Sequence, residues 1–280
     1  MKNTSTTNQI AIPHTKTYRL KSAINNIEYK LFIALPSKYH DNTNSYPVIF
    51  TTDPNFIFPI LLGTTKSLES LIPDAIIVGI GHADLDFLEL DRKTFNARRD
   101  VHRARDFLPW KFSDADKYFS HINSAARNAM VETSGHATEF VDFIETTIIP
   151  FINSTYRTKV ERTLIGHSFG AVLASWIILN RPTIFEKYIV ISPILDLENN
   201  AMFEEISHLA KTTKAKIYFC AGSLEANYSS NKNLIGDLKK FQQQISLSPN
   251  IISKVEIFED EYHASVVPLA VSRGLRFVAQ

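Results

Sequence analysis

The sequence predicts an α/β fold, with one mostly parallel central sheet and helices on both of its faces. Short apolar runs of strand length recur along the chain, and they suit strands that are covered on both sides. Helical stretches separate these runs, and this alternation favours parallel strands joined by right-handed crossovers. The 280 residues are 44% hydrophobic and 21% charged, which is enough apolar material for a sizeable buried core.

The first predicted elements follow a polar tail over residues 1–15. Residues 18–20 and 27–35 alternate apolar and polar side chains around Asn25-Asn26, which is a hairpin signal. We expect two antiparallel edge strands here. Residues 16–280 then form a single domain.

Strands and helices alternate after the hairpin. The predicted strands are residues 47–51, 75–80, 163–165, 188–191, 217–220 and 255–258. The predicted helices are residues 56–71, 136–156, 170–180, 199–211, 234–245 and 265–278. In the helix over 136–156 the apolar side chains fall on one face, and Pro150 is expected to bend it.

One segment interrupts the alternation. From about residue 82 to 131 the chain carries many charges and aromatic side chains without a strand pattern. Long insertions of this kind often form lids or binding loops. We therefore expect a lid or binding insertion at this point.

Composition excludes several classes of partner. A net charge of +1 gives no field that would attract nucleic acid or a membrane surface, and no apolar run is long enough to span a bilayer. The histidines lack paired ligand spacing, so we expect no metal and no cofactor. The single cysteine, Cys220, lies in a predicted buried strand. Residues 1–9 lack the apolar core of a signal peptide, which favours a cytoplasmic location, or a periplasmic one if a leader was removed.

The segment Gly166-His167-Ser168-Phe169-Gly170 lies between a predicted strand and a predicted helix. A sharp turn in this context holds the serine in a strained backbone conformation, and the flanking glycines leave room for the chain to cross. This is the nucleophile elbow of an α/β-hydrolase fold. Ser168 is therefore the candidate nucleophile.

A serine nucleophile needs a base and usually an acid. His263 follows the last predicted strand, and the chain order of serine before histidine is that of the hydrolase fold. Glu225 is the favoured acid because Gly222 marks the end of the preceding strand. Asp196 and Asp260 are the alternatives, as is a dyad without an acid.

Two backbone N–H groups should form the oxyanion hole. One belongs to Phe169, at the start of the helix after the elbow. The other should come from the loop after the first parallel strand, where Pro54 has no N–H and leaves Asn55, the favoured donor, or Asp53. Alternatively, Asp53 and Asn55 cap the helix that follows.

Four segments of the chain resemble the esterase D-like family, and within it the enterobactin-type siderophore esterases. These segments are residues 46–50 leading into Asp53, residues 97–100 with 107–109, the elbow, and residues 261–268 with 272–275. The resemblance implies a serine esterase with His263 as base and Glu225 on the acid loop. Where these relatives carry Asp-Gly in the oxyanion loop, this chain has Asp53-Pro54.

The resemblance also implies a small-molecule substrate, a cyclic triester siderophore such as enterobactin. Guanidinium groups bind oxyanions and stack on aromatic rings, so arginines of the insertion are candidate contacts. The candidate substrate-binding residues are Asp53, Arg98, Arg99, Arg103, Trp110 and His167. Arginine-rich segments more often form solvated faces or ion pairs with the core, and that alternative stays open.

Other functions remain open at this stage. The same fold supports a general short-chain carboxylesterase, a thioesterase, an acyltransferase or a peptidase. A hydrolase-like binding protein without catalysis is the alternative from another class. Intact Ser168 and His263 argue against it.

Overall fold

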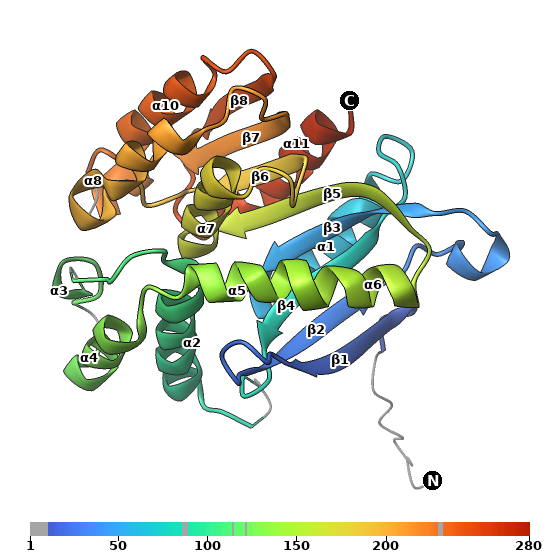
Figure 1. The fold of residues 1–280 in the computed structure, drawn as a ribbon, viewed down its shortest axis with the longest axis horizontal. Coiled ribbons are helices and arrows are strands. Elements are labelled where there is room, and N and C mark those ends of the chain that lie inside the picture. Colours follow the sequence, from blue (N-terminus) through green and yellow to red (C-terminus); the bar gives the residue numbers. More distant parts are fainter. Residues whose placement is uncertain (1–10, 86–88, 114, 121, 229–231) are drawn as a thin grey trace, which may run out of the picture.

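A single eight-stranded sheet forms the centre of the computed structural model, which describes residues 11–85, 89–113, 115–120, 122–228 and 232–280. The strand order is β1-β2-β4-β3-β5-β6-β7-β8, and β3 to β8 run parallel (Figure 1). The strands are β1 Thr15–Lys21, β2 Glu28–Ala34, β3 Tyr46–Thr52, β4 Ile76–His82, β5 Thr158–His167, β6 Lys187–Ile191, β7 Ala215–Gly222 and β8 Ile251–Phe258.

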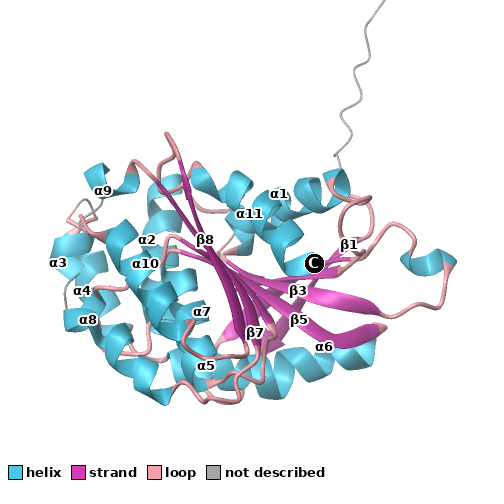
Figure 2. Ribbon diagram, turned by 90° about the horizontal axis from the view of Figure 1, so that it is seen from above, coloured by secondary structure: helices cyan, strands magenta, loops and turns pink. Residues whose placement is uncertain are grey.

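Helices cover both faces of this sheet. They are α1 Pro54–Ser67, α2 Arg92–Phe107, α3 Ala115–Tyr118, α4 Ser124–Thr133, α5 Ala137–Phe143, α6 Ile149–Thr155, α7 Phe169–Asn180, α8 Leu197–Glu204, α9 Glu225–Tyr228, α10 Leu234–Ile245 and α11 Val266–Ala279. Figure 2 shows α1 and α11 on one side of the sheet and α5, α6 and α7 on the other. The predicted α/β architecture is confirmed.

The apolar runs become strands because both of their faces are buried. In β5, Leu164 packs into the core beneath α5 and α7, whereas its neighbour Ile165 packs into the core beneath α1 and α11. Tyr188 and Ile189 of β6 divide in the same way. Successive side chains of a strand point to opposite faces, so a strand inside two layers is apolar at every position.

The predicted hairpin is present, but only β1 lies at an edge of the sheet. β2 pairs with β1 on one side and with β4 on the other, antiparallel in both cases. Tyr29, Leu31 and Ile33 of β2 are fully buried. The expectation of two edge strands was wrong for β2 because its inward face is part of the core.

Some helix boundaries also differ from the prediction. α1 begins at Pro54, since a proline is well suited to the first helical position, where no N–H is needed. α8 ends at Glu204 and continues as a short 3₁₀ segment, Glu205–His208. The helix predicted over residues 136–156 contains a π-helical turn, Ile144–Ile148, just before Pro150. Pro150 has no N–H to donate to the preceding turn, and the wider π-helical turn accommodates it.

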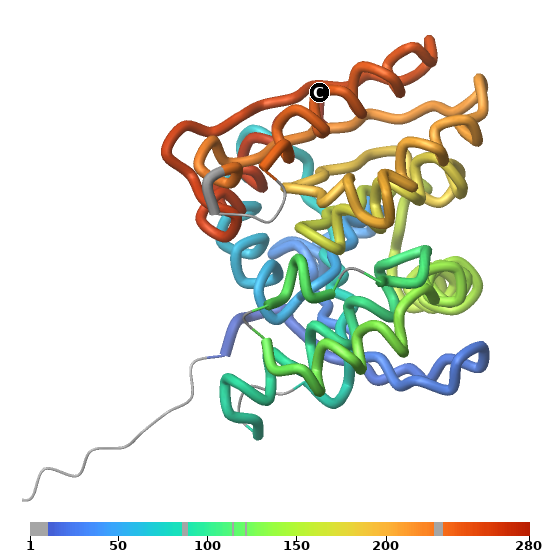
Figure 3. Tube along the Cα trace, turned by 90° about the vertical axis from the view of Figure 1, so that its left-hand side faces the viewer, coloured from blue at the N-terminus to red at the C-terminus, as the bar shows by residue number. Residues whose placement is uncertain are grey.

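The insertion after β4 is largely helical, and α2 packs against α5 and α7. Phe95, Ala104 and Phe107 of α2 are buried. Figure 3 shows α2, α3 and α4 on the side that faces the viewer. Residues 86–88, 114 and 121 of the predicted insertion lie outside the described residues.

Asp106 anchors α2 to the sheet. Its fully buried carboxylate contacts Nε2 of His82 at 2.7 Å, the hydroxyl of Tyr29 at 3.0 Å and Nε of Arg105 at 2.7 Å. Burial alone would raise the pKa of Asp106, but the hydrogen bonds from His82 and Arg105 outweigh it and hold the pKa far below its usual range. The ionised carboxylate therefore joins α2 to β2 and β4.

We expect Asp106→Asn to lower the free energy of unfolding at pH 7 by about 3 kcal/mol, because it leaves a buried network short of its charge. A depressed carboxyl pKa adds stability above the unfolded pKa of about 3.9, and that contribution is lost as the pH falls further. Urea unfolding at pH 7, 5 and 3 should therefore show the difference from the wild type shrinking below about pH 4.

Asp41→Asn, at an exposed carboxylate, is the matched control, with an expected change of less than about 0.5 kcal/mol. An equal Asp106→Asn effect at pH 7 and pH 3 would show that the charge of Asp106 does not stabilise the network.

Candidate active site

The candidate residues gather at one edge of the sheet, because the carboxyl ends of parallel strands lie together. Ser168 follows β5, Glu225 follows β7 and His263 follows β8. Between them in the sheet, β6 ends one residue before Ser192. Four neighbouring strands thus each supply one polar side chain to this edge.

The elbow has the strained geometry that its sequence predicts. Ser168 has φ 59° and ψ −120°, a conformation that costs roughly 1–3 kcal/mol for a residue with a side chain. A Cβ on Gly166 would lie 2.1 Å from the carbonyl oxygen of Gly170, and one on Gly170 would lie 2.2 Å from Oγ1 of Thr52. Glycine is required at 166 because the chain crosses itself there, and at 170 because the side chain of Thr52 leaves no room for a methyl group.

Glu225 is the acid that contacts His263. Its Oε2 lies 2.7 Å from Nδ1 of the imidazole, and its side chain is fully buried. An ionised carboxylate can only accept, so Nδ1 carries the hydrogen and Nε2 of the neutral ring is left with its lone pair. The imidazole is therefore in the tautomer that a general base requires.

Two further groups hold the Glu225 carboxylate in place. Oε1 accepts hydrogen bonds from the hydroxyl of Ser192 at 2.6 Å and from the N–H of Gly222 at 2.7 Å. Ser192 was not predicted from the sequence; its signal is a serine directly after a buried parallel strand. Its φ of 51° turns it out of the strand toward β7. Three donors together compensate for the burial of this charge.

The alternative acids lie elsewhere. Asp196 accepts a hydrogen bond from the hydroxyl of Tyr118 at 2.8 Å and has Nζ of Lys117 at 3.4 Å, so it fastens α3 to the start of α8. Asp260 is exposed in the turn after β8, and its N–H donates to Oγ of Ser223. The preference for Glu225 thus agrees with the hydrogen bonding.

The candidate oxyanion loop lies beside the elbow. Asp53 has φ 51° and occupies the N-cap position of α1, but its side chain makes no capping bond and forms an ion pair with Arg103 instead, 3.0 Å from Oδ1 to Nε. The capping interpretation was therefore wrong for Asp53. Asn55 and Phe169 each lie in a first helical turn, where the N–H has no partner within the helix.

The candidate substrate-binding residues do not share one environment. Arg98 is exposed, whereas Arg99 lines a cavity of about 130 Å³ next to the oxyanion loop. The Arg99 guanidinium also makes two hydrogen bonds to Oδ1 of Asp100, at 2.9 and 2.8 Å. Phe95 and Phe107 line the same cavity, which is mainly apolar, with the cationic Arg99 and with the carboxylate of Asp53 that is paired with Arg103.

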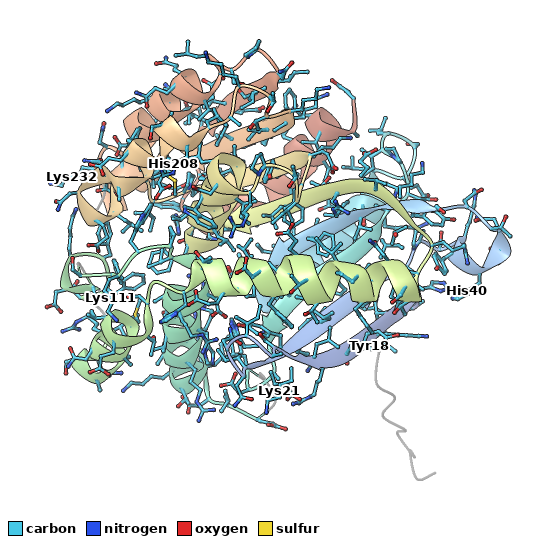
Figure 4. The ribbon with its side chains drawn as sticks, in the orientation of Figure 1. Tyr18, Lys21, His40, Lys111, His208 and Lys232 are labelled. Carbon is cyan, nitrogen blue, oxygen red and sulfur yellow. The ribbon has the colours of Figure 1, made fainter. Side chains whose placement is uncertain are left out.

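Trp110 connects the insertion to the 3₁₀ segment after α8. Its indole N–H donates to Oε1 of Glu205 at 3.2 Å. Figure 4 labels Lys111, next to Trp110, and His208, in the 3₁₀ segment that carries Glu205; both labels fall on the left side of the view. This hydrogen bond gives Trp110 a structural contact that the sequence did not indicate.

His167 contacts the candidate base. Its Nε2 lies 2.7 Å from the carbonyl oxygen of His263, and the two rings have centroids 4.5 Å apart. Burial, with the nearby His263 and Arg103, holds the pKa of His167 well below its usual value. The ring is neutral and donates through Nε2, because a carbonyl oxygen can only accept.

Cys220 has none of the features of a reactive thiol. It is fully buried in β7, and burial raises the pKa of its thiol well above the usual value. Among the described residues, no group of three or more His, Cys, Asp or Glu side chains could hold a metal ion. In the same part of the chain no helix is long and apolar enough to cross a membrane.

Several known proteins with similar sequences are named as siderophore esterases. The chain is 28% identical to the ferri-bacillibactin esterase BesA of Bacillus subtilis, over 98% of this chain and 93% of that protein. It is 24% identical to a siderophore triacetylfusarinine C esterase of Aspergillus fumigatus, over 88% and 87% of the two chains. Both similarities extend over most of each protein.

Solved structures share the fold at lower identity. The BES protein from Bacillus cereus superposes with a TM-score of 0.79 at 23% identity, covering 100% of both chains. The siderophore hydrolase EstB from Aspergillus nidulans has a TM-score of 0.77 at 19% identity, covering 96% of both chains. The family model described as "Putative esterase" matches residues 22–267, which include the elbow, Glu225 and His263. The chain belongs to this esterase family.

Proposed function

We propose that this protein is a serine esterase in which Ser168, His263 and Glu225 act as a triad. One observation carries the proposal: Nδ1 of His263 lies 2.7 Å from Glu225, at the sheet edge where the strained Ser168 follows β5. An imidazole held in this tautomer beside an elbow serine is the arrangement that activates a hydroxyl. The esterase family of the chain supports the same activity.

The first half of the reaction acylates the serine. Nε2 of His263 takes the proton of the Ser168 hydroxyl while Oγ attacks the ester carbonyl carbon. The N–H of Phe169, with that of Asn55 or Asp53, stabilises the resulting oxyanion, and each such donor is worth roughly 100- to 1000-fold in rate. The protonated imidazole then gives its proton to the leaving alcohol, and the acyl group stays on Oγ.

The second half releases the acid. His263 removes a proton from a water molecule, which attacks the acyl carbon, and the second tetrahedral intermediate collapses with return of the proton to Oγ. Buried Glu225 stabilises the imidazolium in both halves, and Ser192 and Gly222 keep its carboxylate in place. The reaction needs no cofactor.

The substrate that we propose is a siderophore ester, an enterobactin-like trilactone with aryl groups and negative charge. The names of the relatives support this class of substrate. The cavity beside the oxyanion loop, with Arg99 next to apolar and aromatic side chains, suits an anionic aryl group. We propose Arg99 as a contact for such a group; exposed Arg98 has the charge but lines no part of this cavity.

We expect hydrolysis of a siderophore trilactone and of p-nitrophenyl acetate and butyrate to depend on Ser168. Ser168→Ala removes the attacking oxygen, so kcat should fall to background, by about a million-fold. The measurement is kcat/KM of both proteins over the whole panel. The trilactone should be the preferred substrate of the wild type.

Two results would contradict this proposal in different ways. Equal rates for wild type and Ser168→Ala, or no turnover by either, would favour a binding protein without catalysis. Turnover that depends on Ser168 but prefers short simple esters or thioesters would support the mechanism and contradict the siderophore ester as the substrate.

The choice of acid can be tested with a matched pair of substitutions. Glu225→Gln keeps the shape of the side chain but replaces one carboxylate oxygen with an NH₂ group. In one orientation of the amide this NH₂ faces the Nδ1–H of His263, and in the other it faces the N–H of Gly222, so one hydrogen bond is lost in either case. We expect kcat to fall by on the order of 100- to 10,000-fold. Asp196→Asn, at the rejected candidate, should leave kcat within about twofold.

The two variants are compared by steady-state kinetics at pH 8, with thermal unfolding as a check that both are folded. A large loss in Asp196→Asn with an active Glu225→Gln would reverse the assignment. Full activity in both would indicate a serine–histidine dyad.

A further inference from the structure

Three loops of the site are joined by two buried side chains that the mechanism above does not use. His167 precedes the nucleophile, and Arg103 comes from α2 in the insertion. Each is only 8% exposed. Both were expected to contact substrate, yet their polar atoms contact the protein.

His167 holds the loop that carries the base. Its Nε2–H donates to the carbonyl oxygen of His263, so the backbone of His263 is fixed from one side while Glu225 fixes its ring from the other. The His263 side chain is 40% exposed and lies in a loop between β8 and α11. Loss of the bond from His167 would remove one of the two hydrogen bonds that hold the backbone and the partly solvated ring of His263 in place.

Arg103 joins the elbow to the oxyanion loop. Its Nη2 donates to the carbonyl oxygen of His167 at 3.2 Å, and its Nε forms the ion pair with Asp53. The guanidinium also lies over the ring of Phe169, 5.5 Å from the centroid. One planar cation therefore contacts both residues that flank Ser168 and the residue that begins the oxyanion loop.

Asp53 depends on this cation. Its φ of 51° is unusual for a residue with a side chain, and its Oδ2 is buried with no hydrogen-bond partner among the described residues. Arg103 compensates the charge through Oδ1 and so favours the left-handed turn that starts α1. The turn sets where the N–H groups of Asp53 and Asn55 point.

We propose that His167 and Arg103 are positioning residues. They hold the loop that carries His263, between β8 and α11, and the oxyanion loop at fixed positions relative to Ser168. This inference rests on the proposed esterase function. It predicts that their loss lowers kcat and leaves KM nearly unchanged, because a displaced base or donor affects the reacting atoms more than substrate binding. A substrate contact would instead raise KM.

His167 is tested by a pair of substitutions that differ in one hydrogen bond. His167→Phe keeps a planar ring but has no donor, whereas His167→Gln places an amide N–H₂ at about the position of Nε2. We expect kcat for p-nitrophenyl butyrate to fall roughly 10- to 100-fold in the Phe variant, with KM within about threefold. The Gln variant should recover most of the rate.

Labelling of Ser168 with a fluorophosphonate separates positioning from misfolding. The Phe variant should label to the same final extent as the wild type but more slowly, since the folded site is present and its base is displaced. Unchanged kcat in His167→Phe, a rise in KM alone, or no rescue by His167→Gln would each overturn the role of His167. Failure of the esterase proposal is distinct, since wild-type turnover would then not depend on Ser168.

A double substitution tests whether His167 and Glu225 act on the same imidazole. Substitutions of residues that hold the same group have strongly non-additive effects on the rate. The kcat of the double variant His167→Phe/Glu225→Gln should therefore be only slightly lower than that of the more damaging single variant. Multiplied losses would show independent effects and contradict the proposal.

Arg103 is tested with Arg103→Lys, which keeps the charge but cannot contact Asp53 and the His167 carbonyl through one rigid fork. We expect kcat to fall about 10-fold with KM nearly constant. Arg92→Lys, at an exposed position of the same helix, is the control and should match the wild type within about twofold. Equal activity of the two variants, or a change in KM alone, would remove Arg103 from the proposal.

Discussion

The crossing of the chain at the elbow is the constraint on which the rest of the site depends. Ser168 leaves β5 in a conformation that no strand or helix uses, and Gly166 and Gly170 are in contact where any side chain would collide. This crossing starts α7 directly above the sheet, so that the hydroxyl and the free N–H groups of the first helical turn share one small volume. Strain of roughly 1–3 kcal/mol is tolerated because the second half of β5, residues 163–167, and all of α7 except Asn180 are buried.

The strands next to β5 bring the other groups of the site close to Ser168. Parallel pairing brings the ends of β5, β6, β7 and β8 to one edge, and the loop after each strand needs only to place one group. A similar steric limit holds at the acid loop, where a Cβ on Gly222 would lie 2.1 Å from the carbonyl oxygen of Glu261. The loop that carries His263 thus passes directly over the end of β7, which brings the imidazole within reach of Glu225.

The sequence was sufficient for the alternation of parallel strands and helices and for the chain order of the site residues, but not for the helices of the insertion or for the place of β2 inside the sheet. Continuous apolar runs identified the parallel strands, and a glycine-flanked serine between strand and helix identified the elbow. The partners of each carboxylate could not be predicted, because Asp196 and Glu225 both follow strands at the correct edge. In the structure their partners differ: Glu225 contacts Nδ1 of His263, whereas Asp196 accepts a hydrogen bond from Tyr118. The extra donor of Glu225 comes from a turn at Ser192 with positive φ, and backbone angles of non-glycine residues leave little trace in a single sequence.

The arginines of α2 divide between two alternatives that the sequence left open, a solvated face and ion pairs with the core. A segment rich in arginine predicts a solvated face, and Arg98 fits that pattern. Asp100, Arg103 and Phe107 recur at helical spacing on the buried face, where charges are normally costly. Arg103 is buried there in contact with the carbonyl oxygen of His167 in the elbow and the carboxylate of Asp53 in the oxyanion loop, and these two groups compensate its charge. The charge of Arg103 is required by those two loops, which lie far from α2 in the sequence. The local sequence pattern of α2 therefore could not show this role of Arg103.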